Sequence, residues 1–239
     1  MNERRYLDVI PVDILTAVEI LSQVTRWLEY SEKSRQIVTL NALMLMGALK
    51  NQSLTKVIST ADLVIADGFG IMAALQRKGV KIPKRLTGIE LVKEILNLPL
   101  SPSKSFFFYG GTISIVKQLK QAIELHWPEI NKTAFWDGYS DNLTKIEVKQ
   151  EIIRRQPDVL LVGLGTPAQE LFLGEILPFL DKTIGIGVGG SFEVIAGVKK
   201  ETPLFFRQQG LEWLWRIGQD PKRIKQIPDL FRFWACFLR

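Results

Sequence analysis

The sequence has few of the side chains that most often form disulfide bonds or bind metals. Its 239 residues include one cysteine, Cys236, and one histidine, His126. A single cysteine excludes an internal disulfide and a cysteine-rich zinc site, which indicates a reducing compartment. A single histidine excludes a metal centre built from several histidines, and a Ser/His/Asp triad would depend on His126 alone.

Long apolar runs and a secretory leader are missing as well. The most apolar stretches, Val159–Leu164 and Ile184–Gly190, are far shorter than the roughly 18–20 residues that a membrane-spanning helix needs. The first residues, Met1–Asp8, are charged and polar, so they do not form the apolar region of a signal peptide. With 46% hydrophobic and 23% charged residues, the composition is that of a soluble globular protein.

The positive charge is concentrated near the C-terminus. The net charge is +6, and the segment from Lys199 onward holds nine basic and four acidic residues. The same segment contains eight aromatic residues: Phe205, Phe206, Trp213, Trp215, Phe231, Phe233, Trp234 and Phe237. Basic segments with interleaved aromatics are typical of binding to nucleic acid or to an anionic membrane. The alternative is a helical pair that packs its aromatics on the body of the protein, although the crowded apolar residues of Pro228–Arg239 favour an interfacial anchor.

The hydrophobic pattern predicts strands that alternate with amphipathic helices. The predicted strands are Gln36–Leu40, Leu63–Ala66, Phe106–Tyr109, Lys132–Trp136, Val159–Val162 and Thr183–Val188. The predicted helices are Asp13–Glu29, Ala42–Lys50, Ser53–Ser59, Ile71–Lys78, Thr87–Leu96, Ile113–Leu125, Lys145–Arg154 and Pro167–Leu177. Continuous apolar strands of this kind indicate a parallel sheet with helices on both faces. We therefore expect a Rossmann-like α/β domain over residues 1–202 and a basic, aromatic-rich helical appendage over residues 203–239.

Five loops, most of them rich in glycine, follow the predicted strands. They are Thr39–Asn41, Asp67–Gly70, Gly110–Thr112, Gly163–Glu170 and Gly187–Phe192. Glycine lets the backbone approach a phosphate, and a helix that starts there supplies free N–H donors. Because parallel strands bring their carboxyl ends to one edge of the sheet, these loops together predict a site for a nucleotide or a nucleotide-sugar.

Two polar residues in these loops have both a chemical and a structural interpretation. Asp67 is placed to accept a proton from an attacking hydroxyl, or else to cap the helix that follows it. Gln169 is placed to bind a ligand, but 166–169 also has the form of a capping box with proline at the first helical position.

A rival function rests on the loop that starts at Gly163. Residues 163–168 fit the strand–GxGxxA–helix pattern of dinucleotide-binding enzymes, but the acidic residue expected about twenty positions later is missing. The sequence also has no Asp-x-Asp pair to hold a divalent ion on a sugar nucleotide. Transfer without a metal would need cations for the leaving diphosphate, and the candidates are Arg207, Arg216 and Arg223.

Several motifs occur together in an order that is specific to one family. They are Thr39-x-Asn41, Ala66-Asp67-Gly68-x-Gly70, Arg85-x-x-Gly88, Gly110-Gly111, Gly138-Tyr139, Gly163-Leu164-Gly165-x-Pro167-x-Gln169-Glu170, Gly187-Val188-Gly189-Gly190-x-Phe192, Gly210-Leu211-Glu212-Trp213-Leu214-x-Arg216 and Pro221-x-Arg223. From about Pro11 to Arg223 the chain resembles the WecG/TagA/CpsF family of bacterial glycosyltransferases.

The resemblance implies an inverting transfer of an N-acetylmannosamine-type sugar without metal or cofactor. The donor would be a UDP-sugar and the acceptor an N-acetylglucosamine on a polyprenyl diphosphate, in the synthesis of teichoic acid or another surface polysaccharide. The tail would bind the inner face of the cytoplasmic membrane, and no nucleic acid would be bound. The oligomeric state is not fixed, and a homo-oligomer is compatible with the sequence.

The resemblance also assigns roles to individual residues. Asp67 would be the general base, with Thr39 beside it in the catalytic pocket. The substrate-binding residues would be Asn41, Arg85, Gly110, Gly111, Gly138, Tyr139, Gly163, Gly165, Gln169, Glu170, Gly189, Gly190, Arg216 and Arg223. Two alternatives to a glycosyltransferase stay open on the residues alone, namely a nicotinamide-dependent oxidoreductase and a basic nucleic-acid-binding module.

Overall fold

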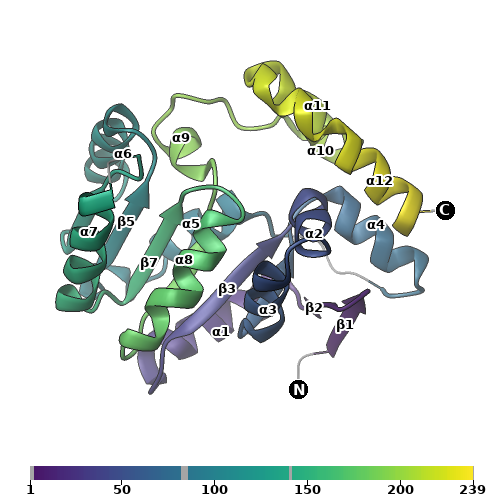
Figure 1. The fold of residues 1–239 in the computed structure, drawn as a ribbon. Helices are drawn as coiled ribbons and strands as arrows, with labels where there is room; N and C mark the ends of the chain where they lie inside the picture. The colour runs from purple at the N-terminus through teal and green to yellow at the C-terminus, as the bar shows by residue number, and fades with distance from the viewer. Residues whose placement is uncertain (1–2, 82–85, 140–141, 239) are drawn as a thin grey trace.

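A six-stranded parallel sheet forms the centre of the protein (Figure 1). The structure is a computed structural model that describes residues 3–81, 86–139 and 142–238. The strands, in their order across the sheet, are β4 (Leu63–Ala66), β3 (Arg35–Leu40), β8 (Ile184–Gly187), β7 (Val159–Gly163), β5 (Phe106–Gly110) and β6 (Thr133–Trp136). All neighbouring strands pair in parallel, so their carboxyl ends lie at one edge. The predicted Rossmann-like α/β sheet is confirmed.

Helices cover both faces of this sheet. On one face lie α1 (Ala17–Tyr30), α5 (Gly88–Leu96), α6 (Ile113–His126) and α9 (Ser191–Ile195). On the other lie α2 (Ala42–Ala48), α3 (Gln52–Thr60), α4 (Phe69–Arg77), α7 (Asn142–Arg155) and α8 (Ala168–Ile176). The short 3-10 helices are η1 (Ser101–Ser103), η2 (Leu177–Phe179) and η3 (Pro221–Gln226).

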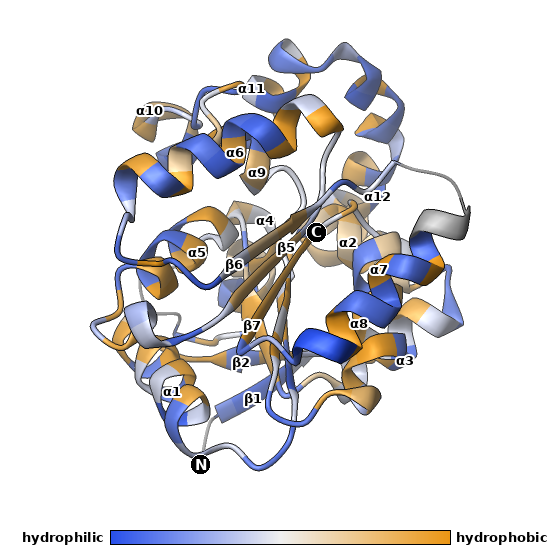
Figure 2. Ribbon diagram, turned by 90° about the vertical axis from the view of Figure 1, so that its left-hand side faces the viewer, coloured by the Kyte–Doolittle hydropathy of each residue, from blue (hydrophilic) through white to orange (hydrophobic). Residues whose placement is uncertain are grey.

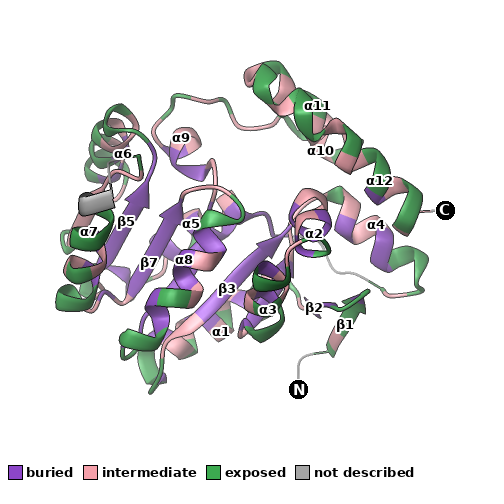
Figure 3. Ribbon diagram, viewed as in Figure 1, coloured by how far each residue is buried: buried purple, intermediate pink, exposed green. Residues whose placement is uncertain are grey.

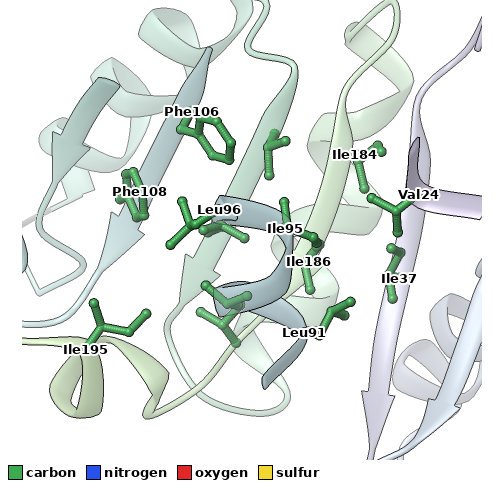
Figure 4. Packing of buried hydrophobic residues seen from close by; sticks show 14 of the residues in the cluster. Val24, Ile37, Leu91, Ile95, Leu96, Phe106, Phe108, Ile184, Ile186 and Ile195 are labelled. Atoms are coloured by element: carbon green, nitrogen blue, oxygen red, sulfur yellow. The ribbon is translucent and has the colours of Figure 1, made fainter. Parts of the chain in front are cut away.

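Most positions in the strands are apolar because successive side chains enter different cores. Phe106 and Phe108 point to the α1/α5 side, where Figure 4 shows them with Leu96 and Ile195. Phe107, between them, packs with α7 and α8 on the opposite face. Figure 3 shows the strands buried between helices whose outer surfaces are exposed, and Figure 2 shows the same strands as the hydrophobic centre. Burial on both faces explains why the sequence has continuous apolar runs instead of alternation.

A β-hairpin at the N-terminus replaces the first part of a predicted helix. The strands β1 (Glu3–Leu7) and β2 (Ile10–Ile14) pair antiparallel, and α1 begins only at Ala17, so the prediction of a helix from Asp13 is wrong at its start. Asp13 is buried and accepts hydrogen bonds from Arg4 at 2.7 Å and from the backbone N–H of Val64 at 2.8 Å. These bonds hold the carboxylate in a strand beside β4.

The C-terminal segment forms three helices and η3 along the carboxyl edge of the sheet. They are α10 (Leu204–Gln208), α11 (Glu212–Gln219) and α12 (Ile227–Phe237), and Figure 1 shows α12 running beside α2 and α4. Phe233 of α12 is fully buried in the core formed by α2, α3 and α4, and Trp234, Phe237 and Leu238 are partly buried against it. The prediction that these residues form an interfacial anchor is therefore wrong for Phe233, because its ring completes the core.

In the described ranges, no helix is both long enough and apolar enough to cross a membrane.

Candidate active site

A cavity of about 570 Å³ lies between the carboxyl edge of the sheet and the C-terminal helices. Its sheet side is formed by the loops that follow four adjacent strands, β4, β3, β8 and β7. Its other wall is formed by residues of α10, α11, η3 and α12. Ligands of open parallel sheets bind outside the carboxyl ends of the strands, so the position of the cavity agrees with the expectation from the loops.

Asp67 lines this cavity directly after β4. Its backbone N–H donates to the carbonyl of Leu40 at 2.7 Å, which places Asp67 next to the end of β3. Helix α4 is capped at Gly68 without a side-chain hydrogen bond, so the alternative interpretation of Asp67 as a helix cap is wrong. The residue is half-buried. A carboxylate in this position can meet a hydroxyl that enters the cavity.

Thr39 and Asn41 come from β3 and its loop, and both line the cavity. The Thr39 side chain is buried, and its hydroxyl donates to the carbonyl of Gly187 on β8 at 3.3 Å. The side-chain oxygen of Asn41 accepts from the N–H of Met44 at 3.0 Å and so caps α2. Both residues therefore shape the cavity floor through bonds within the protein.

Gln169 joins the two glycine loops that follow β7 and β8. Its Oε1 atom accepts from the N–H of Gly165 at 3.2 Å and from the N–H of Gly189 at 2.9 Å. A Cβ atom on Gly187 would lie 2.7 Å from Gln169 Nε2, so glycine at position 187 makes room for this amide. The capping box predicted for 166–169 is wrong, because α8 begins at Ala168 and has no side-chain cap.

Glu170 accepts a hydrogen bond from the Gln169 amide. The Nε2 atom of Gln169 donates to Glu170 Oε1 at 2.7 Å. Glu170 is 1% exposed, and burial raises its pKa above the usual range for glutamate, against the opposing effect of the hydrogen bond from Gln169. Glu170 lies outside the cavity lining. It therefore holds Gln169 in place.

Five other predicted binding residues lie on the same edge but outside the cavity lining, namely Gly110, Gly111, Gly138, Tyr139 and Gly163. The sheet order explains this, because β5 and β6 lie beyond β7 and their loops bond to each other and to β7. A Cβ atom on Gly110 would lie 2.4 Å from the carbonyl oxygen of Gly163, so close backbone approach requires glycine there. Packing accounts for these glycines. Arg85 lies outside the described residues.

The tail contributes cations to the opposite wall. Arg216 of α11 and Arg223 of η3 both line the cavity, at 3.9 Å from Glu212 and 3.5 Å from Asp220. Their side chains are 45% and 30% exposed, and can reach a ligand. Arg207 also lines the cavity, but its side chain is only 14% exposed because it is held in ion pairs within the protein.

Arg207 connects the tail to the body of the protein. It pairs with Glu90 at 3.0 Å and with Glu201, and donates to the carbonyl of Thr202 at 2.7 Å. This network fixes α10 against α5.

Two lysines that the sequence analysis did not assign also line the cavity. Lys199 and Lys200 follow α9, and Lys199 lies 3.4 Å from Glu193. The signal that could have found them is a pair of basic residues directly after the loop of the last strand. With Arg216 and Arg223 they place basic side chains along the cavity, beside the acidic Glu201, Glu212, Asp220 and Asp229, and basic side chains suit a substrate that carries phosphate.

Comparison with known proteins identifies the family. The profile described as "Glycosyl transferase WecG/TagA/CpsF family" matches residues 5–239. An N-acetylglucosaminyldiphosphoundecaprenol N-acetyl-beta-D-mannosaminyltransferase of Bacillus subtilis (strain 168) is 29% identical over 225 residues, covering 91% of this chain and 87% of that protein. The Staphylococcus aureus (strain MW2) protein of the same name is 31% identical over 227 residues, covering 94% and 89%. These matches favour the glycosyltransferase over the oxidoreductase and the nucleic-acid-binding module, and the chain belongs to the WecG/TagA/CpsF family of glycosyltransferases.

Proposed function

We propose that the protein transfers an N-acetylmannosaminyl group from UDP to an N-acetylglucosamine carried on a polyprenyl diphosphate. The relatives are named for transfer of this sugar to this type of acceptor. The observation that carries the proposal is that one cavity is lined both by Asp67 and by the basic side chains of Arg216 and Arg223. A base and a set of cations are the two components that such a transfer requires.

The proposed reaction is a single displacement. The acceptor hydroxyl attacks the anomeric carbon, and its proton passes to the carboxylate of Asp67. The bond from the anomeric carbon to the diphosphate breaks, and UDP leaves with the electron pair. Arg216 and Arg223 stabilise the negative charge that develops on the leaving diphosphate. Attack from the side opposite the leaving group inverts the anomeric centre.

The loops at the sheet edge bind the two sugars in this proposal. The backbones of Gly165, Gly189 and Gly190 approach the substrates closely. Gln169 holds the loop of Gly165 and the loop of Gly189 at a fixed separation. Asn41 and Thr39 form the floor next to Asp67. Gly110, Gly111, Gly138, Tyr139, Gly163 and Glu170 support these loops from behind, and Arg85 completes the set that the family resemblance implies.

We also propose that the appendage, residues 203–239, binds the inner face of the cytoplasmic membrane. It exposes three large apolar residues to solvent. The exposed fractions are 70% for Leu204, 65% for Phe205 and 68% for Phe231. Lys222 and Lys225 are exposed on the same segment. A segment that exposes both apolar side chains and lysines is typical of segments that lie in the interface of an anionic membrane. This position would hold the cavity close to a lipid-linked acceptor.

The test is transfer by purified protein from a panel of UDP-sugars to a short-chain prenyl-diphosphate N-acetylglucosamine, with a chelator present. Product with inverted anomeric configuration is expected. Asp67→Asn should lower turnover about a hundredfold or more while leaving UDP binding intact. Asp181→Asn is the matched control, because Asp181 is exposed and precedes β8 at the opposite edge of the sheet. Near-normal turnover of Asp67→Asn would remove Asp67 from the role of base.

A further inference from the structure

The cavity has a second, apolar part that the transfer chemistry leaves unused. It lies between α2 and α12, where most of the lining residues are apolar. We call this part the α2–α12 groove, and its lining residues are Ala42, Leu43, Met44, Gly47, Leu54, Ile227, Leu230 and Trp234. The polar lining residues at its border are Asn51, Gln226 and Asp229.

One face of α12 lines this groove. Ile227, Leu230 and Trp234 follow the i, i+3, i+7 spacing, so they share a face of the helix. All three are half-buried, although Phe233 on a neighbouring face is fully buried in the core. All three side chains line the groove, and Trp234 in addition packs against the core and stacks on Phe69.

The groove is continuous with the catalytic end of the cavity. Asn41 caps α2 and lies next to Asp67, since Leu40 and Ala66 are paired in the sheet, so the groove starts beside the proposed base. At the other wall Arg223 lies in η3. This 3-10 helix ends directly before Ile227, the first residue of α12. A molecule that extends from Asp67 along α2 thus passes from polar, cationic surroundings into apolar ones.

We propose that the α2–α12 groove binds the first isoprene units of the acceptor lipid. This inference rests on the proposed function, because it assigns the apolar portion of that same acceptor. The acceptor sugar then lies at Asp67 and the hydrocarbon chain lies between the two helices, with the acceptor diphosphate where the polar lining of the cavity meets the apolar lining. Arg216 and Arg223 remain with the diphosphate of UDP. The change from polar to apolar lining along the cavity matches the change from the sugar to the hydrocarbon chain of the acceptor.

Gly47 offers a way to fill the groove without disturbing the fold. It is an interior residue of α2 that lines the groove, and a Cβ atom placed on it would meet only Leu54, at 3.8 Å. Gly47→Phe should therefore place a ring in the groove. Gly218→Phe is the matched control, because it adds the same ring at an exposed glycine of α11 that does not line the cavity and has no atom within 4 Å of a new Cβ. A second variant, Leu230→Gln, makes the opposite wall polar from α12.

The experiment compares two acceptors with the same diphosphate-sugar head, one with a farnesyl chain and one with a methyl group. Wild-type protein should show a KM at least about tenfold lower for the farnesyl acceptor, because the groove buries its methylene groups. Gly47→Phe and Leu230→Gln should raise the farnesyl KM roughly tenfold and leave the methyl KM unchanged. Gly218→Phe should behave as wild type with both acceptors.

A binding measurement separates failure of this inference from failure of the proposed function. Farnesyl diphosphate should bind wild-type protein more tightly than inorganic diphosphate does, and Gly47→Phe should remove the difference. Product formation with equal KM values for both acceptors, or a Gly47→Phe effect that is the same for both, would overturn the groove assignment alone. A change of oligomeric state in Gly47→Phe without any dependence on chain length would assign the groove to a protein partner. Absence of product with either acceptor in wild type would refute the proposed function itself.

Discussion

Replacing Phe233 by alanine tests whether the C-terminal helix is an integral part of the core. The Phe233 ring is fully buried, and it stacks on Phe237 with ring centroids 5.2 Å apart. It faces Gly70, where an added Cβ would lie 3.0 Å from the ring, and Ala42 is the other close neighbour at this point. Because glycine and alanine have no side-chain length with which to fill the space, the cavity left by Phe233→Ala would persist.

The expected cost is therefore about 4 kcal/mol in the free energy of unfolding, within the range for buried phenylalanine. For a domain of this size that loss lowers the melting temperature by roughly 8–16 °C. Urea unfolding gives the free energy and calorimetry gives the melting temperature. If α12 detaches before the body unfolds, limited proteolysis will instead show faster cleavage near residues 219–227.

The matched control is Phe231→Ala in the same helix. Phe231 is 68% exposed, so its loss should change the free energy of unfolding by no more than about 0.5 kcal/mol. Phe231→Ala should reduce sedimentation of the protein with anionic vesicles. Phe233→Ala should reduce this sedimentation only if α12 detaches from the body. Equal stability and equal cleavage rates in the two variants would refute the placement of α12 against α2 and α4.

Two further variants test the loops at the sheet edge. Burial raises the pKa of Glu170, so the folded protein holds this proton more tightly than the unfolded chain does, and the free energy of unfolding falls as pH rises from about 4.3 to the raised pKa. Glu170→Gln should remove that part of the pH dependence in urea unfolding, and unchanged curves would contradict the assignment. Gly110→Ala should cost about 3 kcal/mol or more, because its Cβ would lie 2.4 Å from the Gly163 carbonyl oxygen at a φ of 135°. Gly218→Ala, with no atom within 4 Å of the new Cβ, is its control in thermal unfolding and should be neutral or stabilising.

The sheet could be predicted from the sequence because its strands are buried on both faces. Leu63–Ala66 was predicted with the same bounds that the structure gives to β4. The hairpin at the N-terminus could not be predicted in this way. In the sequence, Asp13 has the position of a polar residue at the start of a helix. Its observed role depends on hydrogen bonds from Arg4 and Val64, which are distant in sequence from each other.

The sequence predicts which polar and basic residues could form the site, but it does not show which loops lie side by side. The sequence shows which loops follow strands, but the order of strands in the sheet decides which loops are neighbours. Gly165 and Gly189 line the cavity, whereas Gly110 lies too far across the sheet. The tail shows a similar limit. Phe231 and Phe233 are both aromatic residues in a basic segment, and only packing distinguishes the exposed ring from the buried one.

The N-terminal hairpin has a consequence for how the protein behaves in a crowded cell. In the described part of the chain β4 is an outermost strand of the six-stranded sheet, and such a strand is a template on which another chain can add. The Asp13 carboxylate occupies the N–H of Val64, and β2 lies alongside β4. Removal of the first sixteen residues would uncover this strand, and intermolecular β-pairing during synthesis would compete with folding.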